Sequence, residues 1–459
     1  MTPRRLFALV DCSAFYCSCE AVFAPTLAGV PVAVLSNNDG CIIARSAEVK
    51  AAGIPMGTPF FKAKDRLAAI GARVYSSNYA LYGDMSRRVM ACLETFTPDV
   101  EPYSIDEAFL HIPTPKGSPE EARREVEVLA REIRARVLRW TGIPVRVSFA
   151  TTRTLAKAAS ELSRAELKAG REPCVCLYGH PGADAWLQQM PAADVWGVGR
   201  RWSARLEALG VRSAADLACV SERVLRQQFN VVLARTAAEL RGLHCVELEA
   251  PDAARKTLVK SRSFGEPVSA LSPLLQAVAT HAARAAEKLR REGLVAGHVQ
   301  ASCTTKGYGD GPHRSYAHAE DLSEHTADSA ALIAAARRCL AGGYVGADHR
   351  GRPYRYRKAG VMLCDIRPAG QEQRALSLAP PQATPSEAER KQRADLMAAV
   401  DLLNGRFGKR AVTFGSMGTP QALRLTREAE GAPLWEMRRE RMSPRYTTRL
   451  DEIPLAYAR

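Results

Sequence analysis

Long apolar runs are missing from this 459-residue sequence, and so is a leader-like start. No window approaches the run of about 18 apolar residues that a membrane-spanning helix needs. The short apolar run from Leu6 to Val10 stops at Asp11, too early for the apolar part of a secretory leader, which spans roughly 7 to 15 residues. These absences argue against a membrane protein and an exported protein, so we expect a cytoplasmic one.

Cysteine and histidine do not occur at the spacings of a zinc site. The 12 cysteines are scattered, and their two close pairs, Cys17 with Cys19 and Cys174 with Cys176, lack a second ligand pair at zinc spacing. The nine histidines form no H-x3-H or H-E-x-x-H pattern. We therefore expect reduced thiols and predict that any bound metal is held by oxygen ligands.

Negative charge is scarce relative to positive charge. The chain has 64 Lys and Arg against 49 Asp and Glu, which gives a net charge of +15. The segment from 255 to 364 alone carries 17 Lys and Arg against nine Asp and Glu. Such a segment favours a polyanionic partner, because phosphate contacts release counterions. A solvated basic face would have the same composition.

The element pattern changes along the chain, and the length itself predicts two to four domains. Short strands and amphipathic helices alternate up to about residue 170, and Gly and Pro then separate short helices over 183–245. Beyond a polar tether, strands are expected over 257–264, 297–304 and 359–363, with helices between them. No internal repeat is found. These patterns predict a multidomain α+β chain.

Three acids lie at or near the ends of predicted strands. Asp11 ends the first apolar run, and Asp106 and Glu107 lie within an otherwise apolar or aromatic stretch, where unpaired carboxylates are costly to bury. Successive strand side chains point to opposite faces, so both acids serve one site only if the chain bends there. Oxygen ligands suit Mg2+, and two such ions would activate a hydroxyl and stabilise a leaving pyrophosphate. Pairing with nearby Arg or Lys side chains explains these acids equally well at this point.

A series of short motifs then occurs in a fixed order. The motifs are Asp11 with Ser13–Tyr16, Ser36–Cys41, Ala44–Glu48, Ser76–Tyr79, Tyr103–Phe109, Val195–Arg201, Ser261–Gly265 and Met442–Arg449. Together they resemble the Y-family translesion DNA polymerases, and within that family the UmuC-type catalytic subunits of bacterial DNA polymerase V, over nearly the whole chain. The resemblance implies a right-hand polymerase fold of class α+β, with a palm, small inserted fingers, a helical thumb and an α+β little finger.

The resemblance also implies domain boundaries and an activity. The implied segments are a palm (1–28 and 72–170), fingers (29–71), a thumb with a helix-hairpin-helix (171–246), a little finger (255–365), a linker (366–386) and a C-terminal tail (387–459). The implied activity is error-prone, template-directed addition of dNTPs to a primer 3'-hydroxyl across damaged DNA, in an SOS-type response. The four domains leave no room before the linker for a proofreading domain of typical size, about 100 residues or more. Implied partners are primer–template DNA, dNTP, a UmuD'-type dimer, the RecA filament and the sliding clamp, in a bacterial, nucleoid-associated cytoplasmic setting without a membrane.

Roles for individual residues follow from the same resemblance. Asp11, Asp106 and Glu107 are implied to be catalytic and to hold two Mg2+ ions together with the backbone carbonyl of Cys12. Tyr16 is implied to be a steric gate whose ring leaves no room for a 2'-hydroxyl. The residues implied to meet the incoming dNTP are Phe15, Tyr16, Arg45, Lys50, Lys157 and Arg164.

The fingers depart from the family pattern. Many members have a Tyr-x-x-Arg pair where this chain has Ala47 and Lys50, and a palm lysine where it has Arg164. Lysine binds phosphate as a point charge, whereas arginine offers a bidentate fork. We therefore expect the fingers to contact the triphosphate differently here.

Two regions are implied to contact DNA. Gly197 and Gly199 between short helices resemble a helix-hairpin-helix, whose turn lets backbone N–H groups approach a phosphate. Alternating Tyr and Arg before the strand at 359–363 would place cations along one face, although charges on an edge strand also block aggregation. The implied DNA-binding residues are Gly197, Gly199, Arg200, Arg262, Arg355 and Arg357.

The predicted linker contains a short stretch that resembles a sliding-clamp peptide. Its matching residues are Gln373, Leu376 and Leu378, while the usual closing aromatic is missing because Ala379 follows.

Two other functions stay open besides polymerisation: a non-catalytic DNA-binding scaffold of a mutagenesis complex, and a nucleotidyl cyclase. The complete acidic triad argues against the scaffold, and the basic segment argues against a cyclase, which has no duplex to hold.

Overall fold

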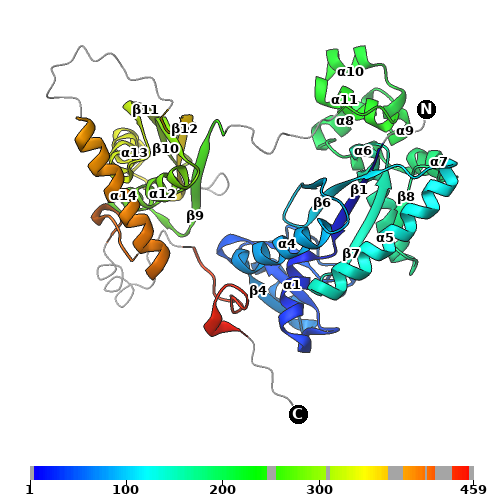
Figure 1. Cartoon of the computed structure of the whole chain (residues 1–459). Coiled ribbons are helices and arrows are strands. Elements are labelled where there is room, and N and C mark those ends of the chain that lie inside the picture. The colour runs from blue at the N-terminus through cyan, green and yellow to red at the C-terminus, as the bar shows by residue number, and fades with distance from the viewer. Residues whose placement is uncertain are drawn as a thin grey trace. The chain divides into compact units, whose positions relative to one another are not determined.

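The computed structural model describes residues 5–245, 255–305, 311–370, 386–408, 411–418 and 437–453. It divides into two compact units (Figure 1). Unit 1 comprises Met1–Ala250 and Glu440–Arg459, and unit 2 comprises Pro251–Arg439. Unit 2 is therefore inserted between two parts of unit 1 along the sequence. In the described ranges, no helix combines the length and the apolar character needed to cross a bilayer.

A five-stranded sheet forms the centre of unit 1, in the order β5-β6-β1-β7-β8. Its strands are β1 (Arg5–Cys12), β5 (Val100–Pro102), β6 (Glu107–Pro113), β7 (Val145–Ala150) and β8 (Cys174–Cys176). All neighbours are antiparallel except β7 and β8. β8 lies beyond the expected end of the palm segment at residue 170, so this sheet extends past that boundary. β1 is central, and both its ladders are filled, which fixes the position of the acid near its end.

The two faces of this sheet are covered by different helices. Even-numbered apolar residues of β1 pack in one core with α1 (Phe15–Phe23), α4 (Tyr79–Leu93) and α5 (Pro119–Thr141). Odd-numbered ones pack in another core with α6 (Arg153–Lys168) and the short helices that follow it. The alternation of strand side chains thus separates two layers. Asp11 is odd-numbered, so it lies on the face that α6 covers.

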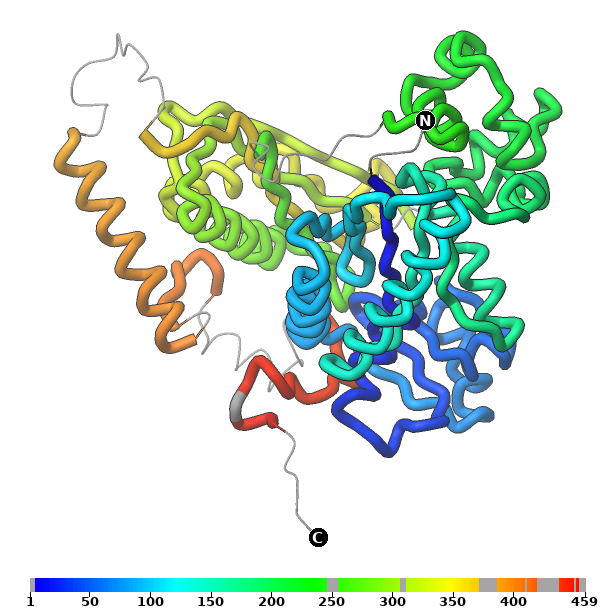
Figure 2. Tube along the Cα trace, turned by 45° about the vertical axis from the view of Figure 1, so that its right-hand side comes forward, coloured from blue at the N-terminus to red at the C-terminus, as the bar shows by residue number. Residues whose placement is uncertain are grey.

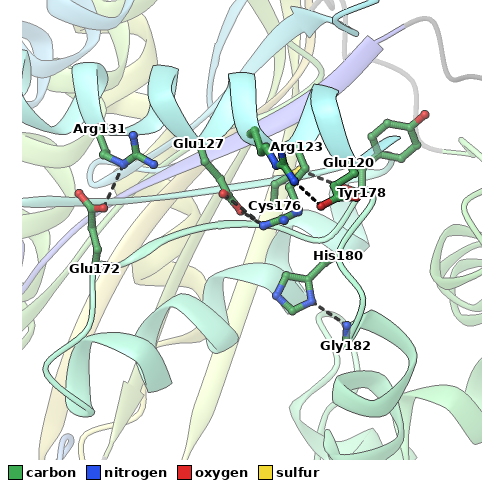
Figure 3. A network of polar contacts seen from close by, with 10 residues as sticks. Glu120, Arg123, Glu127, Arg131, Glu172, Cys176, Tyr178, His180 and Gly182 are labelled. Carbon is green, nitrogen blue, oxygen red and sulfur yellow. Dashed lines mark hydrogen bonds and ion pairs between the residues drawn. The ribbon is translucent and has the colours of Figure 1, made fainter. Parts of the chain in front are cut away.

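Helix α5 shows how the sequence sets the limits of an element. Ser118 and Glu121 form a reciprocal capping box at its start, and Gly142 ends it with a left-handed φ of 72°. Figure 3 shows how its outer face is tied to the neighbouring strand: Arg131 pairs at 3.0 Å with Glu172, just before β8. The helix is therefore fixed at both ends and along its length, as support for the sheet.

A small sheet of order β3-β2-β4 belongs to the same unit. Its strands are β2 (Val32–Leu35), β3 (Ile42–Arg45) and β4 (Arg73–Ser76), and its helices are α2 (Ala47–Ala51) and α3 (Phe60–Ala69). Leu35, Ile42, Val49 and Leu67 contribute to its own buried core. β4 lies two residues beyond the expected end of the fingers at 71 and pairs in parallel with β2, so the small sheet extends past that boundary.

Short helices without a strand follow β8, as the spacing of Gly and Pro predicted. They are α7 (Ala183–Gln189), α8 (Arg200–Ala208), α9 (Ala214–Cys219), α10 (Glu222–Gln228) and α11 (Val231–Leu240). Helices α9, α10 and α11 each begin at a side-chain cap: Ser213, Ser221 and Asn230, respectively.

Short 3-10 turns also occur along the described chain. They are η1 (Pro25–Leu27), η2 (Asn37–Asp39), η3 (Ala192–Asp194), η5 (Gly415–Met417) and η6 (Leu450–Glu452).

Unit 2 is built on an antiparallel sheet of order β11-β10-β12-β9. Its strands are β9 (Leu258–Val268), β10 (Leu294–Thr305), β11 (Ser315–Thr326) and β12 (Tyr356–Pro368), and its helices are α12 (Leu271–Arg291), α13 (Ser329–Gly343) and α14 (Glu387–Phe407). α12 and α13 share one core with the sheet. β11 was not expected from the sequence, because it is an edge strand with no buried residue, mostly polar side chains and no apolar run.

Candidate active site

The strand ends bring two acids and two cations into one row. In the antiparallel ladders, Asp11 lies opposite Glu107 on one side and opposite Arg146 on the other. Directly opposed residues share a face, so all three side chains project from the face that α6 covers. Arg146 Nη2 donates to Asp11 Oδ2 at 2.5 Å, and Lys157 Nζ, from α6, donates to Glu107 Oε2 at 2.8 Å. The register of β1 therefore determines the composition of the site.

Asp106 joins this row because the chain bends just before β6. The backbone amides of Tyr103 and Ser104 both donate to the carbonyl of Glu107 at 3.0 Å, and residues 104–106 form the bend that the sequence required. The amide of Cys12 donates to the Asp106 carbonyl at 2.9 Å, which ties the bend to the end of β1. Asp106 thus lies just before β6, where side chains do not have to alternate between the two faces of the sheet.

All three acids lie around Cys12. Burial raises the pKa of the Cys12 thiol well above its usual value, and the charges of Asp11, Asp106 and Glu107 raise it further, in that order among the three. Carboxylate oxygens are the hard donors that Mg2+ uses. The residue types present therefore suit the metal that the sequence implied.

The carboxylates are nevertheless held by protein groups in this structure. Asp11 and Glu107 have the cation partners given above, and Ser104 Oγ donates to Asp106 Oδ1 at 2.6 Å. Over the described part of the chain, no group of three His, Cys, Asp or Glu side chains is arranged closely enough to hold a metal ion. Metal binding at these acids thus requires that Arg146 and Lys157 give up or share their carboxylates.

Tyr16 lies next to the acids, at the start of α1. Ala14 precedes that helix with a left-handed φ of 45°, an uncommon conformation for alanine that turns the chain sharply between Asp11 and Tyr16. The Tyr16 ring stacks on Tyr82 with a centroid distance of 4.5 Å and an interplanar angle of 17°. Burial raises the pKa of Tyr16 to about 12, with contributions from Tyr79 and Asp106. Its ring therefore has a fixed orientation close to Asp106.

A group of cations lies around Lys50, on the small sheet's side of unit 1. The pKa of Lys50 is lowered by burial and then by four positive charges: Lys168, Arg164, Arg45 and Arg146. Such mutual repulsion is unfavourable unless an anion neutralises it. This concentration of positive charge beside the acidic row suits a polyphosphate.

The other residues expected to contact a nucleotide lie in different surroundings. Phe15 is 3% exposed and belongs to the core on the α1 side of the sheet. Arg45 donates to the carbonyl of Ile54, which holds its side chain against the loop after α2. Arg164 pairs with Glu161, one helical turn away, at 2.9 Å and is 43% exposed. Lys157 lies 4.4 Å from the centre of the Tyr103 ring.

The residues expected to contact DNA are on the surface in two places. In unit 1, Gly197 has a φ of +90°, Gly199 precedes the first turn of α8 without a side-chain cap, and Arg200 is exposed. In unit 2, Arg262 on β9 and Arg355 before β12 are exposed, whereas Arg357 is half-buried. Gln373, Leu376 and Leu378 lie outside the described residues.

Two functional candidates were missed by sequence reasoning, Arg146 and Lys168. Arg146 is a single arginine inside the apolar strand β7, and a buried charge of this kind calls for a partner. That signal was available in the sequence, but the identity of the partner depends on the strand register. Lys168 ends α6 and looks like an ordinary C-terminal helix cation.

Comparison with known proteins assigns the chain to a family. The model of the impB/mucB/samB family matches residues 10–161, and the model of its C-terminal domain matches residues 255–376. The chain is 42% identical over 450 residues to the protein UmuC of Salmonella typhimurium, covering 98% of this chain and 99% of that protein. The chain belongs to the impB/mucB/samB family. It is a UmuC-like Y-family DNA polymerase, as its sequence motifs predicted.

More distant family relatives and a solved structure agree. Identity is 38% to the protein MucB of Escherichia coli, over 98% of this chain and 99% of that protein. It is 31% to a DNA polymerase IV of Alkalilimnicola ehrlichii, over 64% and 79%. A Y-family DNA polymerase chimera of Dbh and Dpo4 matches with a TM-score of 0.60 at 19% identity, over 79% of this chain and 99% of that one. The predicted α+β polymerase fold class is confirmed. A domain of unknown function also matches residues 394–456.

Proposed function

We propose that this polymerase adds dNTPs to a primer 3'-hydroxyl opposite damaged template bases, with low fidelity, by two-metal phosphoryl transfer. The observation that carries the proposal is the juxtaposition in unit 1 of three groups of residues. Asp11 lies opposite Glu107, and the Asp106 carbonyl accepts from the Cys12 amide; the Tyr16 ring stacks on Tyr82; and the charges of four other cations act on Lys50. Acids, an aromatic surface for the sugar and positive charge for the triphosphate are the three parts that such a reaction needs.

The acidic row would hold the metal. Asp11, Asp106, Glu107 and the carbonyl of Cys12 would bind two Mg2+ ions, which lower the pKa of the attacking hydroxyl and neutralise charge on the leaving pyrophosphate. Arg146 and Lys157 neutralise Asp11 and Glu107 in the absence of substrate, and we propose that they share these carboxylates once substrate binds. The row is thereby kept in place without an uncompensated buried charge.

The remaining residues bind and select the nucleotide. Lys50, Arg164 and Lys168 would bind the triphosphate, because the charges of Lys168 and Arg164 repel that of Lys50 and an anion relieves this repulsion. The Tyr16 ring would exclude a 2'-hydroxyl by overlap, since its stacking on Tyr82 prevents it from moving aside. The sequence of α8 and the basic residues of unit 2 would hold the DNA backbone without reading its sequence.

Primer extension on an abasic-site template tests the catalytic proposal. We expect Asp106→Asn to lower extension at least about a thousandfold, because it removes one carboxylate that the charge of the transition state requires. Asp99→Asn is the matched control, since Asp99 pairs at 3.6 Å with Arg5, which lies at the opposite end of β1 from Asp11, and both side chains of this pair are more than half exposed. The assay is run with and without a UmuD'-type dimer and RecA filaments, which we propose as partners in an SOS-type response.

The alternative function is a non-catalytic, polymerase-like DNA-binding scaffold of a mutagenesis complex. One observation favours it: Asp11 and Glu107 already pair with protein cations. If the wild-type protein binds primer–template DNA but extends nothing under any of these conditions, the scaffold replaces the polymerase proposal. Extension by the wild type and by Asp99→Asn, but not by Asp106→Asn, excludes the scaffold.

A further inference from the structure

The end of the described chain returns to unit 1 as a strap, which we define as residues 440–449. In Figures 1 and 2 it is red and lies near the blue elements at the start of the chain. The Ser76 amide of β4 donates to the carbonyl of Arg441 at 2.9 Å, and the Arg441 amide donates to Ser76 Oγ at 3.0 Å. The Glu440 amide donates to Asp39 Oδ2 at 3.0 Å. The strap thus binds the small sheet through its backbone.

Asn78 connects the strap to the start of α4. Its side-chain oxygen accepts from the Leu81 amide and caps that helix. Its side-chain nitrogen donates to Ser443 Oγ at 3.0 Å and to the carbonyl of Pro444 at 3.0 Å. Asn78 is fully buried and Ser443 is 6% exposed. A single amide therefore fixes both the helix start and the strap.

Glu20 of α1 is the second buried group that the strap contacts. Its Oε1 accepts from Ser443 Oγ at 3.0 Å and from the Tyr82 hydroxyl at 2.7 Å. Its Oε2 is buried and has no hydrogen-bond partner among the residues that the structure describes. A carboxyl group that is 1% exposed depends strongly on the donors it does have. One of the two donors belongs to a residue more than 420 positions away in the sequence.

Tyr82 carries this network to the active site. Its hydroxyl is bound to Glu20, and its ring stacks on Tyr16 at 4.5 Å. Further along the strap, Tyr446 stacks on Phe23, at the other end of α1, with centroids 4.8 Å apart and an interplanar angle of 11°. The strap therefore contacts both the helix that carries Tyr16 and, through Glu20, the ring that supports it.

We propose that the strap is a positioning element of the nucleotide site, in which Ser443 and Asn78 hold Tyr82 through Glu20 and so fix the Tyr16 ring. This inference rests on the proposed role of Tyr16 in sugar selection. It assigns a role to the end of the region 394–456, which matches a domain of unknown function.

The test compares dCTP and rCTP insertion opposite dG by the full-length protein under the extension conditions above. We expect Ser443→Ala and Tyr82→Phe each to lower the ratio of kcat/KM for dCTP to that for rCTP by about two- to tenfold, the range for loss of one hydrogen bond. The change should appear mainly in KM for the nucleotide. The double variant should lose less than the product of the two single effects, because both act through Glu20.

Asn404→Ala is the matched control in the same terminal region. Asn404 of α14 exchanges hydrogen bonds with the backbone of Val412 within unit 2 and is not part of the network around Glu20. We expect it to leave the sugar ratio unchanged. Hydrogen exchange of the amides in 15–23 and 79–85 provides a readout that does not depend on activity, and it should accelerate in Ser443→Ala but not in Asn404→Ala.

Tyr16→Ala separates failure of this inference from failure of the proposed function. If Tyr16→Ala lowers the sugar ratio while Ser443→Ala and Tyr82→Phe leave both the ratio and the exchange as in wild type, the strap has no positioning role. A loss of stability in Ser443→Ala with an unchanged ratio also overturns the proposal, because the strap would then be structural only. If Tyr16→Ala leaves the ratio unchanged, the gate itself is refuted, and so is any link from the strap to sugar selection.

Discussion

Carboxylates within unit 1 are held in two different ways. At the strand ends, Asp11 and Glu107 each accept from a cation, Arg146 and Lys157 respectively. Beneath the strap, the donors to Glu20 within the described ranges are both hydroxyl groups, and burial raises its pKa to about 7. A protein cation can be exchanged for a metal cation without leaving the acid uncompensated. A carboxyl group that accepts hydrogen bonds from hydroxyl groups has no cation partner that a metal ion could replace. This arrangement suits a structural role.

Replacement of Arg146, the cation partner of Asp11, is expected to change stability more than any of the substitutions that follow. Arg146→Met should lower the free energy of unfolding of unit 1 by about 3 to 5 kcal/mol, because it leaves Asp11, whose side chain is 13% exposed, without its cation. Urea denaturation followed by tryptophan fluorescence measures this, since four of the five tryptophans lie before residue 250. The control Arg5→Met breaks an exposed ion pair and should cost less than about 1 kcal/mol. Equal losses in the two variants would show that Asp11 does not depend on Arg146.

Replacement of Glu20 tests the other arrangement through its pH dependence. Because the folded-state pKa of about 7 lies above the usual 4.5, the folded protein binds more protons than the unfolded chain between these values. The stability of the wild type therefore falls as pH rises from about 4.5 to about 7. Glu20→Gln lacks this titration, so the free energy of unfolding of the variant should rise relative to that of the wild type by about 2.5 kcal/mol between pH 5 and pH 8.

The groups that face Glu20 set the design of that experiment. Tyr82 and Ser443 donate to it, and its charge also acts on Tyr75, Tyr446, Cys17 and Cys19. Burial and Glu20 raise the pKa of each of these tyrosines and cysteines, so they stay neutral over this pH range. Parallel stability curves for wild type and Glu20→Gln would mean that Glu20 is ionised at low pH and that its burial is compensated in another way.

The sequence was sufficient to place the acids but not their partners. Asp11 follows an apolar run and Asp106 and Glu107 interrupt another, so strand periodicity located both ends of the row and required the bend between them. Arg146 became a partner of Asp11 only through the register of β7 against β1. Register depends on which residues of two strands face one shared core, and that is a property of the assembled sheet.

The strap was beyond sequence reasoning for a different reason. Residues 387–459 were expected to be a C-terminal tail, and the structure assigns 440–453 to unit 1. The strap contains no helix or strand and therefore has no periodicity to recognise. Its contacts to Asn78 span 365 residues or more, a distance over which neither propensity nor hydrophobic pattern carries information. The motif at Met442–Arg449 did mark the segment, without indicating what it contacts.

Lys50 differs from both groups of carboxylates, because the charges that act on it have the same sign as its own. Its replacement is expected to have a smaller effect than the two replacements above. Lys50→Ala should raise KM for dNTP by about three- to tenfold with little change in kcat, because an exposed cation contributes about one charge-assisted hydrogen bond to a phosphate. Stability should be unchanged or slightly higher, since repulsion from Lys168 and Arg164 is relieved. Single-turnover insertion kinetics measure the effect, with Lys64→Ala, on the exposed side of α3, as the control. A fall in kcat without a change in KM would place Lys50 at the transition state and not in binding.

The smallest expected effect concerns the ring contact that holds the strap's far end. Tyr446→Leu should destabilise unit 1 by about 1 kcal/mol, because it removes the stack on Phe23 while keeping much of the apolar area. Tyr446→Phe keeps the ring and loses only the hydroxyl, so it should match the wild type in urea denaturation. If Tyr446→Phe costs as much as Tyr446→Leu, the hydroxyl is what matters, and the strap, like Glu20, is then held by hydroxyl groups and not by aromatic packing. If neither variant changes stability, the strap is held by its hydrogen bonds, those to Asn78 and Glu20 among them, and the positioning of Tyr16 passes through Glu20 without help from the far end of α1.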